Sequence, residues 1–203
     1  RYYVAPTGER YPSVTEILGA TAPVNVGLQE WRDRVGEKEA QKVSDISTAR
    51  GRRIHKLIED YLYGQPIPKN TMPSNLQMFL QMKRQLDRAL TVIYGIEARM
   101  FSHRLKLAGT CDLLGEWNYI PSVIDHKTSK SEKMREDIEG YFLQCTLYSM
   151  MFEDLTGLHL EQLVVLIGCD DALEAQVFIE HRKNYEEKVL TILEEYRRMK
   201  SHG

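Results

Sequence analysis

The sequence predicts a mixed α/β (α+β) fold, with a central mixed sheet flanked by helices in the order α-β-β-β-α-β and an added N-terminal helical region. In the first half of the chain, apolar residues recur at helical spacing. From Val92 onward, strand-like stretches dominate, and a long helix interrupts them. The 203 residues are enough for one domain. We expect residues 1–47 to form an N-terminal hairpin and helices, and residues 48–203 to form the core.

The N-terminal region is expected to contain one hairpin and two helices. Ser13 followed by Glu16 is a capping-box pattern, which predicts a helix start. The expected elements are a hairpin within Tyr2–Tyr11 and helices at Ser13–Leu18 and Trp31–Val43.

The core begins with a helix over Thr48–Tyr63, where apolar residues follow helical spacing until Gly64–Pro68 ends it. The apolar run Leu163–Cys169 is typical of a buried strand. The other expected elements are helices at Leu76–Leu90, Asp137–Leu155 and Asn184–Met199, strands at Val92–Phe101, Leu107–Trp117, Val123–Lys127 and Ala175–Ile179, and a turn at Asn118–Pro121.

Composition excludes several classes of protein. No apolar run approaches the roughly 20 residues that a membrane helix needs, so we expect no membrane association. The three cysteines, Cys111, Cys145 and Cys169, form no CxxC pair and cannot supply a four-cysteine zinc or iron–sulfur site. They favour a reducing compartment. The net charge of −2 gives no global sign of nucleic-acid binding, so any such sign must be local.

Two carboxylates and a lysine fall on neighbouring expected strands. Asp125 and Lys127 are two residues apart and should share one face of their strand, and Asp112 lies on the strand before them. Clustered acids need a counter-charge, which a divalent cation supplies. Magnesium prefers carboxylates and water.

Two helices carry further polar pairs at a spacing of four. His55 and Glu59 share one face of the Thr48–Tyr63 helix, with Gly51 one turn earlier, and Gln144 and Tyr148 share a face of the later long helix. Taken singly each pair is weak, since such residues are ordinarily packing or surface residues. The combination in this order is more specific.

The series Gx3Hx3E, GTxD, IDxKTS and Qx3Y resembles the RecB-like branch of the PD-(D/E)XK nuclease superfamily. Within that branch it is similar to the mitochondrial genome maintenance exonucleases and their phage-encoded relatives. The resemblance runs from Pro12 to Tyr148, includes Glu97 on the first strand, and implies a restriction-endonuclease-like core. His126 stands where those proteins carry an aromatic or aliphatic residue, and its side chain is expected to face away from the metal. The chain lacks the four cysteines of relatives that hold an iron–sulfur cluster, so no such cluster is expected.

The resemblance also implies residue roles. The ligands of a Mg2+ (or Mn2+) ion would be His55, Asp112, Asp125 and the backbone carbonyl of His126. Lys127 would act in catalysis together with His55, Asp112 and Asp125, by positioning water and stabilising charge on the phosphoryl oxygens. Gln144 and Tyr148 would orient DNA or support the residues around the metal. Glu59 and Glu97 would be supporting residues.

Basic residues gather around these motifs. Arg50 and Arg53 lie one turn from His55, and Lys130 follows the IDxKTS motif. These three, with Thr128 and Ser129 of that motif, are the expected DNA contacts. The alternative is a solvated helix face.

Three functions remain open at this point. The first is a metal-dependent DNA exonuclease that prefers single-stranded ends and acts in replication, recombination or repair. The second is a structure-selective endonuclease of the same superfamily. The third is a non-catalytic DNA-binding protein that has kept the fold. We expect an intracellular monomer. The cytoplasm of a phage-infected bacterium is favoured, and a mitochondrial location also fits.

Overall fold

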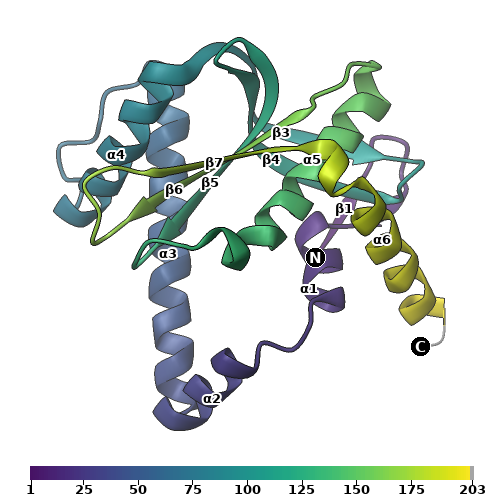
Figure 1. Ribbon diagram of the computed structural model, residues 1–203, viewed down its shortest axis with the longest axis horizontal. Coiled ribbons are helices and arrows are strands. Elements are labelled where there is room, and N and C mark those ends of the chain that lie inside the picture. The colour runs from purple at the N-terminus through teal and green to yellow at the C-terminus, as the bar shows by residue number, and fades with distance from the viewer. Residues whose placement is uncertain (202–203) are drawn as a thin grey trace.

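A five-stranded mixed sheet forms the centre of the molecule in the computed structural model, which describes residues 1–201 (Figure 1). The strand order is β3-β4-β5-β6-β7, with β5 and β6 parallel and the other neighbours antiparallel. The bounds are β3 Leu90–Ser102, β4 Leu107–Trp117, β5 Ile120–Ser129, β6 Gln162–Cys169 and β7 Gln176–His181. A separate hairpin pairs β1 (Tyr2–Val4) with β2 (Arg10–Pro12). The expected α/β class is confirmed.

Helices cover both faces of this sheet (Figure 1). Their bounds are α1 Val14–Thr21, α2 Val26–Val35, α3 Glu37–Leu62, α4 Pro73–Ala89, α5 Glu139–Thr156 and α6 Glu186–Ser201, with short 3-10 turns η1 Arg135–Ile138 and η2 Arg182–Asn184. One core lies between the sheet and α3 with α4. The other lies between the sheet and α1, α5 and α6. No helix among residues 1–201 is long and apolar enough to span a membrane.

Strand β6 shows why the sequence forms two cores. Val164 and Leu166 enter the core under α3 and α4, while Leu163, Val165 and Ile167 enter the core under α5. All five are fully buried or nearly so. A strand covered on both faces is apolar at every position, as the run Leu163–Cys169 predicts.

Strands β4 and β5 form a tight hairpin and then separate. Asn118 and Tyr119 have φ of +53° and +67°, which a two-residue type I′ turn requires. Pairing runs from Trp117↔Ile120 only as far as Leu113↔Ile124. Beyond that point β4 continues beside β3, and β5 continues beside β6. The turn is shorter than expected, because Pro121 lies within β5.

The N-terminal helices differ from the sequence prediction. The sequence predicted two separate helices with a break between residues 43 and 48, and this prediction was wrong, because α3 runs without interruption through the segment. The expected boundary between residues 47 and 48 therefore falls inside a helix. The break lies instead at Gly36, whose φ of +83° few other residues adopt, and whose N–H donates to the carbonyl of Arg32. The N-terminal half of α3 extends away from the sheet, with α2 at its foot (Figure 1).

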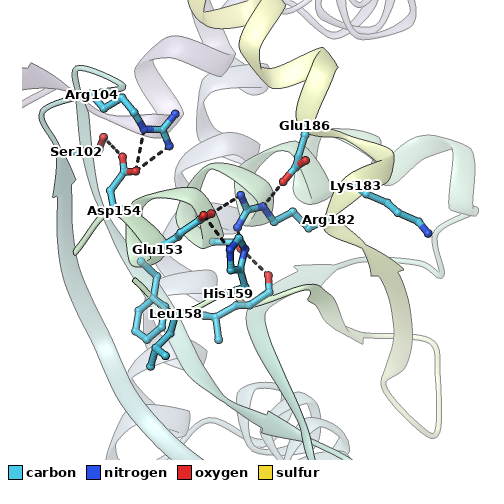
Figure 2. Close-up of polar contacts among 12 residues, drawn as sticks. Ser102, Arg104, Glu153, Asp154, Leu158, His159, Arg182, Lys183 and Glu186 are labelled. Carbon is cyan, nitrogen blue, oxygen red and sulfur yellow. Dashed lines mark hydrogen bonds and ion pairs between the residues drawn. The ribbon is translucent and has the colours of Figure 1, made fainter. Parts of the chain in front are cut away.

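A buried arginine ties the last helix to α5. Arg182 forms ion pairs with Glu153 of α5 and Glu186 of α6 (Figure 2). Its guanidinium also donates to Ser149. His159 contacts the same Glu153 at 3.2 Å. Since the buried guanidinium is compensated by two carboxylates, the network fixes α6 against α5.

Candidate metal centre

The candidate site lies where β4 and β5 separate, beside the middle of α3. The backbone N–H of His126 on β5 donates to Asp112 Oδ2 on β4 at 2.9 Å, and this bond links the two strands where their pairing has ended. His55 of α3 lies against both strands. Its Nε2 is 2.8 Å from the carbonyl oxygen of His126, and its Nδ1 is 3.5 Å from Asp112 Oδ1. The structure therefore brings His55, Asp112 and the His126 carbonyl together.

Glu97 of β3 completes a set of possible metal ligands. One ligand atom each from His55, Glu97 and Asp112 lies within 4.8 Å of the others. Glu97 has a φ of +47°, which is uncommon for a residue other than glycine and marks stored strain. It lies between the pairs Ile96↔Leu113 and Ala98↔Cys111, and thus opposite Asp112. Ile96 packs toward α3 whereas Ala98 packs toward α5, so the side-chain alternation of β3 changes at Glu97.

Asp125 and Lys127 form an ion pair on the same face of β5, as their spacing predicts. Asp125 is 1% exposed, and neither of its carboxylate oxygens has a hydrogen-bond partner within residues 1–201. Lys127 is partly exposed, and its Nζ lies 5.1 Å from the centre of the Tyr141 ring. Asp125 is outside the set formed by His55, Glu97 and Asp112.

The charges at the site depend strongly on one another. Burial acts to lower the pKa of His55, but polar contact with Asp112 outweighs it and raises this pKa to about 9. Burial acts to raise the pKa of Asp112, yet His55 holds it well below its usual range. Burial raises the pKa of Asp125 to about 6, against the opposing charge of Lys127. Burial, followed by the charge of Asp112, also raises the pKa of Glu97. Two carboxylates are thus costly to ionise without a cation.

The donor set fits a hard divalent cation. It contains carboxylates, one backbone carbonyl and one imidazole, which suit magnesium or manganese better than a thiolate-seeking metal. Burial raises the pKa of Asp125 even with Lys127 in contact, so a further positive charge would stabilise this carboxylate.

The side chain of His126 does not face away from this centre, and that expectation was wrong. Its Nδ1 is 3.9 Å from Asp112 Oδ2, and its ring meets the His55 ring edge to face at 6.0 Å. The strands have parted here, so Asp112 reaches the face of β5 that carries His126. The residue is 2% exposed, and burial lowers its pKa to about 4, so it packs as a neutral ring.

Gln144 is half-buried and Tyr148 is buried on α5, which packs under the sheet. Tyr148 is 4% exposed, and the Gln144 amide donates to its hydroxyl at 3.4 Å. A Cβ at Gly109 would come within 2.8 Å of Tyr148 Cε1, so the glycine of the GTxD motif is needed for close packing. Of the two roles expected for this pair, support of the strand that carries Asp112 matches their position.

The expected DNA contacts occupy different environments. Arg50 forms an ion pair with Asp170, while Arg53 and Lys130 are exposed. Ser129 is buried and Thr128 is half-buried. Glu59, expected as a supporting residue, forms an ion pair with Lys56 and lines the hollow that holds His55.

Tyr141 is the site residue that the motifs did not indicate. It is half-buried on α5, and burial raises the pKa of its hydroxyl. Its position three residues before Gln144 on the face of α5 that meets the sheet is the sequence signal that could have found it.

Comparison with known proteins gives little further information. No protein-family model matches the chain, and neither does any curated protein. Among solved structures, one similar chain is a "Putative exonuclease" from Eubacterium rectale, at 13% identity and a TM-score of 0.48. The match covers 71% of this chain and only 64% of that one. The function proposed below therefore rests on the residues of the site.

Proposed function

We propose that this chain is a metal-dependent deoxyribonuclease that hydrolyses phosphodiester bonds. One observation carries the proposal. The cluster of His55, Glu97 and Asp112 borders a hollow at the point where the strands part, and the Asp125–Lys127 ion pair lies on the strand beside it. Phosphodiester hydrolysis needs a cation to neutralise phosphate charge and a fixed positive group for the charge that develops.

Each residue has a role that follows from its surroundings. His55, Glu97 and Asp112, with the carbonyl of His126, would hold the cation, and Asp125 is proposed as a further ligand. A bound Mg2+ would supply a more acidic water and neutralise charge on the phosphate. Asp125 and the Tyr141 ring hold the Lys127 ammonium in place. The ammonium then stabilises charge on the phosphoryl oxygens.

Lys127 keeps its charge across the physiological range. Burial acts to lower its pKa, but Asp125 and Asp112 outweigh burial and raise the pKa above its usual value. An ammonium that stays protonated suits charge stabilisation and not proton abstraction. Lys127 is therefore proposed as an electrostatic catalyst.

DNA is proposed as the substrate because of the order of the motifs and the basic residues near them. The series from Gx3Hx3E to Qx3Y resembles the RecB-like nucleases, and Arg52 and Arg53 are exposed on α3 within a turn of His55. Among residues 1–201, neither arginine forms an ion pair. Arg52 lines the hollow that holds His55 and is placed for phosphate, whereas Arg53 contacts Met72 and lines a separate hollow.

We further propose exonucleolytic action on single strands. Helix α2 and the first half of α3, which precede His55 in the sequence, extend beyond the sheet (Figure 1). Helices near a metal site can narrow its entrance to the width of one strand. A duplex would then have to unpair at a cost of about 1.4 kcal/mol per step, and a free end would enter more readily than an internal segment.

The test compares three substrates of equal length with the same protein and Mg2+: a linear single strand, a closed circular single strand and a blunt duplex. The linear single strand is expected to be cleaved fastest, and the circle is expected to resist. Cleavage of the circle at the linear rate would favour an endonuclease. Preference for the duplex would contradict single-strand selectivity, and binding without cleavage of any substrate would favour a non-catalytic protein.

A further inference from the structure

A second hollow continues the site across the sheet. The hollow that contains His55, Glu97 and Asp112 meets another of about 600 Å³, and both are lined by Glu59 and Glu97. The second hollow runs over β3 and β4 toward the β1–β2 hairpin, and its lining includes Tyr3, Ala5, Arg99, Phe101 and Thr110. The two hollows together form one groove, with the metal cluster part of the way along it.

Two arginines line the second hollow: Arg1, which also lines the first, and Arg99, which lines only the second. Arg99 is exposed and forms no ion pair within residues 1–201, whereas Arg50 and Arg135 are neutralised by carboxylates. Arg99 pairs with Thr110 across β3 and β4, so their side chains share one face of the sheet. An unpaired guanidinium beside a hydroxyl is suited to bind a phosphate.

The distance from the cluster matches the spacing of a nucleic-acid backbone. Arg99 follows Glu97 by two residues and Thr110 precedes Asp112 by two, which is about 7 Å along a strand. Phosphates of one stacked DNA strand are about 3.4 Å apart along the axis, and unstacked strands are more extended. A phosphate one or two linkages away from the cluster would therefore reach Arg99.

Resting on the proposed function, the geometry points to a subsite for a neighbouring phosphate of the same strand, with the Arg99 guanidinium as its ligand and the Thr110 hydroxyl beside it. Phe101, half-buried in the lining, supplies aromatic surface for a base, while the Arg1 guanidinium lies over the Tyr3 ring. The substrate class is then a single strand with at least one phosphate beyond the one that is cleaved.

The subsite is tested by the salt dependence of binding. Fluorescence anisotropy would measure the affinity of wild type, Arg99→Ala and Arg88→Ala for a labelled oligothymidylate in Ca2+ over a range of salt concentrations. Arg88 is the matched control, because it is exposed on α4 and lines neither hollow. Loss of one phosphate contact should reduce the slope of log affinity against log salt by about 0.7 in Arg99→Ala. The slope should not change in Arg88→Ala.

Conservative variants separate a direct contact from a structural effect. Arg99→Lys keeps the charge and should restore most of the slope. Thr110→Val replaces the hydroxyl with a methyl group of similar size and should weaken binding without changing the slope. Equal slopes for Arg99→Ala and Arg88→Ala would overturn the subsite, even if the protein cleaves DNA. If instead the slope depends on Arg99 but no strand is ever cleaved with Mg2+, the subsite stands and the proposed hydrolysis is overturned.

Discussion

Lys127→Ala is expected to lower the rate of DNA cleavage by about 10²–10³-fold, the usual cost of removing one group that stabilises charge in a transition state. The ammonium is held by the buried Asp125 and lies over the Tyr141 ring. Truncation removes the positive charge and leaves the strand pairing of β5 unchanged. Single-turnover cleavage of a labelled single strand would measure the loss.

The control for this variant is Lys69→Ala, which removes an exposed lysine in the loop between α3 and α4. It should cleave at the wild-type rate. Circular dichroism and the urea midpoint would verify that Lys127→Ala is folded. Near wild-type turnover by a folded Lys127→Ala protein would remove Lys127 from the mechanism.

Loss of metal binding is the second large effect expected. Loss of a residue that only hydrogen-bonds to a metal ligand typically lowers metal affinity by roughly 10–100-fold. Asp112→Asn and His55→Ala each remove a proposed ligand, so each should weaken Mn2+ binding by more than this. Both residues belong to the set within 4.8 Å, and so does Glu97. Glu97→Gln should therefore weaken binding as well. Calorimetric titration of the metal into each variant would measure the dissociation constants.

Glu132→Gln is the matched control for these titrations, because it neutralises an exposed carboxylate outside the set. Its Mn2+ affinity should equal that of wild type. If Asp112→Asn bound Mn2+ as tightly as Glu132→Gln, the cluster would not be the metal site.

The same titrations should depend on pH in a definite direction. An imidazole must be neutral to ligate a metal, and Asp112 raises the pKa of His55 to about 9 in the metal-free protein. Below about pH 9, binding of Mn2+ must displace a proton from His55. The Mn2+ affinity should therefore rise by up to about tenfold for each unit of increasing pH, and it should level off above about pH 9. His55→Ala should lose this part of the dependence.

The sequence predicted the parts of the site that depend on local periodicity. A spacing of two residues placed Asp125 and Lys127 on one face of β5, and the helical pattern around His55 placed it on α3. The apolar run of β6 predicted a strand buried on both faces. These features follow from side-chain periods of 2.0 residues in a strand and 3.6 residues in a helix, which can be read from neighbouring positions in the sequence.

The remaining features depend on tertiary contacts. Glu97 adopts a positive φ within a regularly paired part of β3, and no local pattern signals it. His126 was expected to face away because strands alternate, but the parting of β4 and β5 brings Asp112 to its side. The ion pair of Arg50 with Asp170 joins residues 120 positions apart. Such pairings are visible only in the folded chain.

The most direct measurement of the central claim is cleavage of an end-labelled single strand by the wild-type protein with Mg2+ and with excess EDTA. Short products are expected with Mg2+, none with EDTA, and recovery when Mg2+ is added back, because the carboxylates need the cation. Equal cleavage in EDTA, or no cleavage of any DNA with Mg2+ or Mn2+, would contradict the claim.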